Sequence, residues 1–159
     1  MVPWGTVCID LVGHYTILDK KGKDRTLLAI TFVDPVTGWC EITEIHEKSR
    51  AKISHIFNST WLARYPRPQK VIFDNGHEFK KDFSPLIHDF AIKPIPSTIK
   101  NRQSNAILER LYQVLGDMLC TKNFEQYNFD DVDPWSELLA SVTWAISSTH
   151  HTTLPLSLT

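Results

Sequence analysis

Three acidic residues stand where ordinary structural roles do not account for them, and the first is Asp10. It interrupts the apolar run of residues 6–12, whose β-branched and apolar side chains predict a buried strand. Its same-face neighbours, Cys8 and Val12, place the carboxylate on a mostly buried surface. A carboxylate there needs backbone donors, a charged partner or a metal, and these interpretations stay open for Asp10 taken alone.

The other two acids are Asp74 and Glu109. Asp74 follows a predicted strand and opens an Asp-Asn-Gly turn, which is often only structural, although ligands collect at the carboxyl ends of strands in α/β sheets. Glu109 lies on the polar face of a predicted helix, between Asn105 and Gln113 at four-residue spacing, where a solvated carboxylate is the usual case. Two acids from strands and one from a helix can nevertheless converge on one pocket.

A cluster of three carboxylates favours a divalent cation, because the cation relieves the repulsion between them. An all-oxygen ligand set suits Mg²⁺ or Mn²⁺, which keep bound water and share the phosphate oxygens of a substrate. Two such ions can activate a nucleophile and stabilise the leaving oxygen of a phosphodiester. The residue types therefore indicate metal-dependent phosphoryl chemistry.

The elements that must position these acids follow from hydrophobic periodicity. Three strands joined by short turns predict an antiparallel meander, and alternating helices and strands follow it. The expected strands cover residues 6–12, 26–33, 39–45, 70–73 and 92–95, and the expected helices cover residues 49–65, 78–90, 103–120 and 134–148. This order predicts an α/β fold, with a mixed sheet and helices on its faces.

Length, composition and charge limit the class of protein. The chain has 159 residues, 42% hydrophobic and 22% charged, which is typical of one globular domain. Its apolar runs are too short to cross a bilayer, so no membrane partner is expected. The net charge of −1 hides a basic surplus of four over residues 1–122 and five acids without Lys or Arg over residues 123–159. So small a surplus is weak evidence for a phosphate-bearing partner.

Three segments around the acids, taken in order, resemble the catalytic core of retroviral-type integrases, and most nearly that of gypsy-type LTR retrotransposons. The segments are VCIDLVG (7–13), VIFDNGHEF (71–79) and QSNAILER (103–110), with 34 residues between Asp74 and Glu109. The resemblance extends to DPVTGW (34–39), HTT (151–153) and the order of elements, and so covers essentially the whole chain. Each motif alone is weak evidence for the resemblance, and the resemblance is specific because all of the motifs occur in the same order.

The resemblance implies a ribonuclease H-like fold, with a five-stranded mixed sheet and helices on both faces, in a single catalytic core domain over residues 1–159. It implies hydrolysis at DNA ends and strand transfer into target DNA, dependent on Mg²⁺ or Mn²⁺. It also implies a core homodimer, in the nucleus or an intracellular particle. The zinc-binding and C-terminal DNA-binding domains of the family are expected to be absent from this sequence.

The resemblance also assigns roles to individual residues. Asp10, Asp74 and Glu109 match the catalytic triad that binds the metal. The segment after the second aspartate supports the site through Asn75, Gly76 and Glu78. The residues expected to approach DNA are Lys100, Arg102, Gln103, Asn105 and Gln113.

Two alternatives remain open at the level of sequence. Arg102 stands where the family usually has proline, and Ala106 where it often has glycine, which favours a non-catalytic or co-opted module that keeps the fold and the dimer. The intact triad argues against that module. The second alternative is a ribonuclease H-type nuclease, which usually carries a fourth acid close to the third; the helix over residues 103–120 offers only Asp117 besides Glu109.

Two tryptophans of the last predicted helix have two possible roles. Trp135 and Trp144 either fill the core or anchor a dimer interface, where aromatic residues are enriched. The sequence alone favours neither role over the other.

Overall fold

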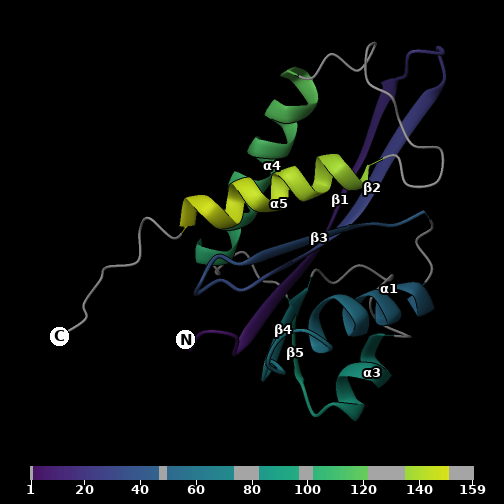
Figure 1. The fold of residues 1–159 in the computed structure, drawn as a ribbon. Helices are drawn as coiled ribbons and strands as arrows, with labels where there is room; N and C mark the ends of the chain where they lie inside the picture. Colours follow the sequence, from purple (N-terminus) through teal and green to yellow (C-terminus); the bar gives the residue numbers. More distant parts are fainter. Residues whose placement is uncertain (1, 47–49, 74–82, 97–101, 122–134, 151–159) are drawn as a thin grey trace.

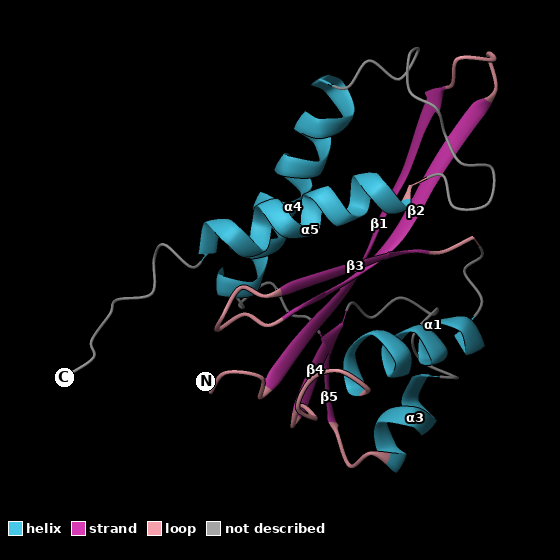
Figure 2. Cartoon of the chain, viewed as in Figure 1, coloured by secondary structure: helices cyan, strands magenta, loops and turns pink. Residues whose placement is uncertain are grey.

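The computed structural model describes residues 2–46, 50–73, 83–96, 102–121 and 135–150 (Figure 1). They form a five-stranded sheet with helices on both faces (Figure 2). The strands are β1 (Thr6–Leu18), β2 (Asp24–Val33), β3 (Cys40–Glu44), β4 (Lys70–Phe73) and β5 (Lys93–Pro96). The helices are α1 (Arg50–Phe57), which continues as the π-helical turn η1 (Asn58–Leu62), α3 (Phe83–Asp89), α4 (Arg102–Thr121) and α5 (Ser136–His150).

The strand order β3-β2-β1-β4-β5 places β1 at the centre of the sheet. β2 pairs antiparallel with β1 and with β3, which confirms the predicted meander. β4 runs parallel to β1 and to β5, so the sheet is mixed as predicted. In the parallel register Ile9 lies opposite Phe73, and in the sequence an aspartate follows each of them.

The sheet buries both of its faces, because successive side chains of a strand point in opposite directions. Val7 and Ile9 of β1 pack with α1, η1 and α3 in a first core. Cys8 and Val12 pack with α4 and α5 in a second core. Figure 1 shows α4 and α5 on one side of the sheet and α1 and α3 on the other. The nearly continuous apolar runs of β1 and β2 are therefore typical of strands covered on both sides.

α4 is an amphipathic helix with one firmly buried stripe. Leu111 and Leu115, one turn apart, are fully buried in the second core. Glu109, Gln113 and Asp117 are exposed. The predicted helix over residues 103–120 is confirmed to within one residue at each end, and its polar face lies away from the packed stripe.

The hairpin of β1 and β2 is longer than the sequence indicates. The periodicity predicts strands over residues 6–12 and 26–33 with a loop between them, but β1 continues to Leu18 and β2 begins at Asp24. A bulge between Gly13 and Tyr15 lets the strand continue. Gly13 has a φ of +111°, and a Cβ at this position would collide with the carbonyl oxygen of Leu27, so only glycine fits. The predicted loop was wrong because the polar residues beyond Gly13 lie on a two-stranded ribbon.

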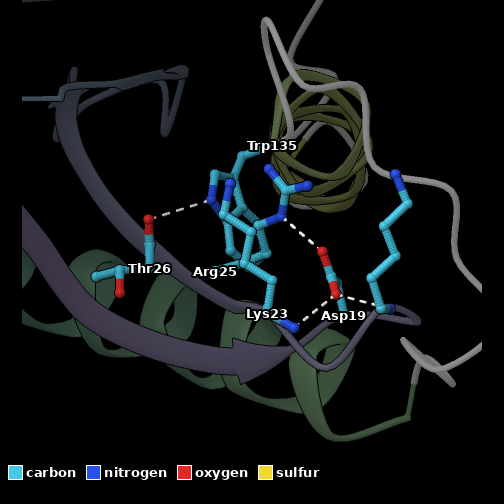
Figure 3. A network of polar contacts seen from close by, with 6 residues as sticks. Asp19, Lys23, Arg25, Thr26 and Trp135 are labelled. Carbon is cyan, nitrogen blue, oxygen red and sulfur yellow. Dashed lines mark hydrogen bonds and ion pairs between the residues drawn. The ribbon is translucent and has the colours of Figure 1, made fainter.

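The hairpin closes on the carboxylate of Asp19, which is buried (Figure 3). Its Oδ1 accepts hydrogen bonds from the backbone N–H groups of Lys21 and Lys23, at 2.8 and 2.9 Å. Its Oδ2 accepts a hydrogen bond from Nε of Arg25 at 3.0 Å. The backbone N–H donors hold the pKa of Asp19 below its ordinary value, with a further contribution from Arg25.

The two tryptophans of the C-terminal helical segment have different environments. Trp135 is fully buried in the second core, and its indole N–H donates to the carbonyl oxygen of Thr26 at 3.3 Å (Figure 3). Trp144 on α5 is 73% exposed. The core role therefore holds for Trp135, and only Trp144 remains a candidate for an interface.

The remaining helices follow the prediction with shifted ends. Ile53, Phe57 and Trp61 are fully buried at four-residue intervals, but the helix over residues 49–65 ends at Leu62 and its last turn is π-helical. The described part of the helix over residues 78–90 is α3, and α5 begins and ends two residues later than expected. Within the described residues, no helix has the length and apolar character needed to span a membrane.

Candidate active site

Asp10 lies on the face of β1 that packs against α4 and α5, as its spacing from Cys8 and Val12 predicts. The side chain is half-buried. Its Oδ1 accepts a hydrogen bond from the backbone N–H of Leu11 at 2.9 Å. Its Oδ2 accepts a hydrogen bond from the hydroxyl of Tyr112. A buried carboxylate needs hydrogen-bond donors, and here one donor comes from the backbone of β1 and another from a side chain of α4.

Tyr112 contacts Asp10 and is a residue that the sequence did not single out. It is half-buried on α4, packs against the second core and reaches Asp10 across 102 positions of sequence. Burial, and next the hydrogen bond to the Asp10 carboxylate, raise the pKa of the Tyr112 hydroxyl well above its ordinary value. The phenol therefore stays protonated and acts as the donor. The only signal in the sequence was an aromatic residue with a polar end at the border of the apolar stripe.

Glu109 lies on the same side of α4 as Tyr112. Residues three and four positions apart are neighbours on a helix surface, and Glu109 precedes Tyr112 by three positions. Glu109 is exposed, which confirms its predicted place on the polar face. The hydrogen bond between Tyr112 and Asp10 therefore joins the helix that carries Glu109 to the central strand.

The other predicted site residues fall outside the described side chains. Asp74, Asn75, Gly76, Glu78 and Lys100 lie outside the described residues. The backbone of Arg102, Gln103 and Asn105 forms the first turn of α4, and their side chains are not described. The structure therefore brings together Asp10 and the helix of Glu109, and it does not test the remaining assignments.

The donor chemistry of the described part of the site fits a hard divalent cation. Asp10 and Glu109 offer carboxylate oxygens, which are the ligands that Mg²⁺ and Mn²⁺ prefer. Among the described residues, no group of three or more His, Cys, Asp or Glu side chains lies close enough to hold a metal ion. A complete ligand set thus needs a contribution from beyond these residues.

A separate groove runs between the edge strand β3 and helix α5. Its volume is about 790 Å³. Its lining includes Ile42, Glu44, Arg64, Leu139 and Trp144. We call this surface the β3–α5 groove; Asp10 does not line it, so it is distinct from the candidate metal site.

Solved structures that are similar to this chain include retroviral integrase catalytic cores. The catalytic core domain of BIV integrase has a TM-score of 0.63 and 16% sequence identity, over 91% of this chain and 80% of that one. The HTLV-2 integrase catalytic core domain in complex with magnesium, in a dimeric form, has a TM-score of 0.68 and 14% identity, over 91% and 87%. This chain therefore has the ribonuclease H-like fold that these integrase catalytic cores share.

A third similar structure is an assembly. The simian T-cell lymphotropic virus intasome, in complex with PP2A regulatory subunit B56 gamma, matches with a TM-score of 0.70 and 16% identity, over 98% of this chain and 56% of that one. No protein-family model matches the sequence, and no curated protein sequence matches it. At such low identity the structural likeness shows the fold, and the chemistry has to be argued from the residues.

Proposed function

We propose that this chain is the catalytic core of a retrotransposon integrase of the gypsy type. It hydrolyses a phosphodiester bond at an element's DNA end and joins the new 3′-hydroxyl to target DNA. The observation that carries the proposal is the position of Asp10 on the central strand of this fold, hydrogen-bonded to the helix that presents Glu109. This placement agrees with the order of motifs in the sequence.

The proposal completes the metal site with Asp74. β1 and β4 are paired up to Ile9 and Phe73, and Asp10 and Asp74 are the next residues in sequence. In two similar structures the HTLV-2 core is in complex with magnesium, which supports Mg²⁺ or Mn²⁺ as the cofactor here.

In the proposed mechanism the chain's own residues hold and orient the reacting groups. Asp10, Asp74 and Glu109 hold the cations, which, when bound, lower the pKa of the attacking water or 3′-hydroxyl and stabilise the leaving 3′-oxygen. The buried side chains Leu111 and Leu115 fix the backbone of α4, so that Glu109 keeps its position while its carboxylate remains exposed. Asn75, Gly76 and Glu78 support the segment that follows Asp74.

The proposed DNA partner approaches along α4. Gln113 is exposed one turn after Glu109, and Lys100, Arg102, Gln103 and Asn105 precede it at or before the first turn of the helix. Amide side chains and cations of this kind contact phosphate and sugar oxygens and set the position of a duplex. We further propose a homodimer, located in the nucleus or an intracellular particle.

The test is metal-dependent joining on a preassembled branched DNA, a reduced reaction that reverses strand transfer and is the one expected of the core alone. Asp10→Asn and Glu109→Gln are expected to abolish the reaction while circular dichroism stays unchanged, since Glu109 is exposed on α4 and asparagine keeps the size of the half-buried Asp10 side chain. Glu78→Gln is expected to lower activity only in part. Asp117→Asn is the matched control, because Asp117 is exposed two turns further along the same helix.

Three outcomes would contradict the proposal in different ways. A fully active Glu109→Gln protein would remove the triad assignment. A folded wild-type chain without metal-dependent activity on any branched DNA would favour a non-catalytic module. Loss of activity in Asp117→Asn, together with cutting of RNA–DNA hybrids, would favour a ribonuclease H-type nuclease with a fourth acid.

A further inference from the structure

Both oxygens of the Asp10 carboxylate accept a hydrogen bond. Oδ1 accepts from the backbone N–H of Leu11 at 2.9 Å, and Oδ2 accepts from the hydroxyl of Tyr112. An ionised carboxylate has about four lone-pair sites, so these two bonds leave acceptor capacity on each oxygen. The contacts therefore set the orientation of the carboxylate without using up its ability to bind a cation.

The two donors fix the carboxylate in different ways. The N–H of Leu11 belongs to the strand that carries Asp10, so it moves with that strand. Tyr112 comes from α4, whose neighbouring residues Leu111 and Leu115 are fully buried, and it is thus anchored to the second core. The terminal torsion of an aspartate is otherwise broad, and a fixed donor on the second oxygen restricts it.

Tyr112 also connects the two candidate ligands that the structure describes. It lies three positions after Glu109 on one side of α4 and contacts Asp10 on β1. The hydroxyl therefore sets the rotation of the Asp10 carboxylate and links the helix that carries Glu109 to the strand. Packing needs only the ring of Tyr112, so the hydroxyl is the part whose role calls for an explanation.

We infer that Tyr112 is a positioning residue for the metal site: its hydroxyl orients the Asp10 carboxylate toward a bound divalent cation and couples β1 to the helix of Glu109. The inference rests on the proposed function, because it assumes that Asp10 is a metal ligand. Residues that orient metal ligands in this way typically change metal affinity about 10–100-fold when they are replaced.

The experiment measures the dissociation constant of Mn²⁺ from the loss of the free-ion electron paramagnetic resonance signal, on the whole chain without DNA. Tyr112→Phe keeps the ring and removes the hydroxyl, and it is expected to weaken Mn²⁺ binding at least about tenfold. The unfolding temperature of Tyr112→Phe without metal is expected to stay close to that of the wild type. If the hydroxyl served only the fold, weaker Mn²⁺ binding would instead be accompanied by a lower unfolding temperature. Tyr15→Phe is the matched control, since Tyr15 lies on β1 and also packs against the second core, and Mn²⁺ affinity is expected to be unchanged.

Asp10→Asn separates this inference from the function on which it rests. If Mn²⁺ binding is lost in Asp10→Asn and equal or tighter in Tyr112→Phe, the metal site stands and the role of Tyr112 is overturned. If Asp10→Asn binds Mn²⁺ as the wild type does, or the wild type binds none, both proposals fall. A Tyr112→Phe protein that does not fold would show that the hydroxyl serves the fold itself, which also overturns the inference.

Discussion

The Asp10 carboxylate illustrates how far single residues can be interpreted from sequence. A polar residue inside an apolar strand is a local signal, so Asp10 could be identified, and its half-buried position between Cys8 and Val12 follows from the period of a strand. The hydrogen bond from Tyr112 depends on where α4 crosses β1, 102 positions later in the chain. No local pattern contains that information, so the partner of Asp10 could only be found in the folded structure.

The residue-scale prediction concerns stabilisation by metal. Neighbouring carboxylates repel, so a cation that binds only the folded chain should raise its stability. At a hundred times its dissociation constant the expected gain is about 2.7 kcal/mol. Thermal unfolding in EDTA and in excess Mn²⁺ measures it, with Asp10→Asn expected to lose the gain and Asp117→Asn to keep it. Identical unfolding in EDTA and Mn²⁺ would contradict a metal site at Asp10.

Among the elements, the β1–β2 hairpin departs most from expectation, and its tip depends on one buried carboxylate. Asp19 accepts hydrogen bonds from two backbone N–H groups of the turn and from Arg25 (Figure 3). The sequence indicated a loop here because polar residues and glycines dominate it. Helix α4 was predicted almost to the residue, since a long apolar period averages over many positions.

The element-scale prediction is a pH dependence of hairpin stability. The folded chain holds the pKa of Asp19 below its ordinary, unfolded-chain value, mainly through the N–H of Lys23. The ionised carboxylate therefore stabilises the fold above that value, and the contribution is lost as the pH falls through the folded value. Asp19→Asn is expected to lower the unfolding temperature at pH 7, by a margin that shrinks in acid.

Thermal unfolding of the wild type and Asp19→Asn from pH 7 down to pH about 2.5 measures this margin. Asp24→Asn serves as control because Asp24 is exposed on the same hairpin, and its margin is expected to be small throughout. A margin for Asp19→Asn that stays constant into acid would show that the charge of Asp19 does not stabilise the turn.

At the scale of the whole molecule, the order of elements carried more information than any single motif. Alternating periods of two and 3.6 residues gave the mixed sheet, because parallel strands need helical crossovers and antiparallel ones need only turns. The same reasoning could not decide between core and interface for Trp135 and Trp144. That distinction depends on the direction in which α5 lies across the sheet, which places one ring in the second core and the other in solvent.

The whole-molecule prediction is self-association through the β3–α5 groove. Trp144 lines this groove and is 73% exposed, and an exposed tryptophan beside an apolar groove is typical of an interface anchor. Sedimentation equilibrium should show a species heavier than the 18.3 kDa chain. Trp144→Glu should raise the dimer dissociation constant by about thirtyfold or more, the equivalent of the 2 kcal/mol that defines an interface hot spot.

Leu18→Glu is the matched control for Trp144→Glu. Leu18 is also a large exposed apolar side chain, 60% exposed, but it lies at the hairpin tip and does not line the groove. An equal loss of association in both variants would mean that general surface hydrophobicity holds the copies together. A wild-type chain that stays monomeric at high protein concentration would remove the dimer altogether. Because the groove lies apart from Asp10, Trp144→Glu should also keep the Mn²⁺ affinity of the wild type, so assembly and metal binding can be lost independently.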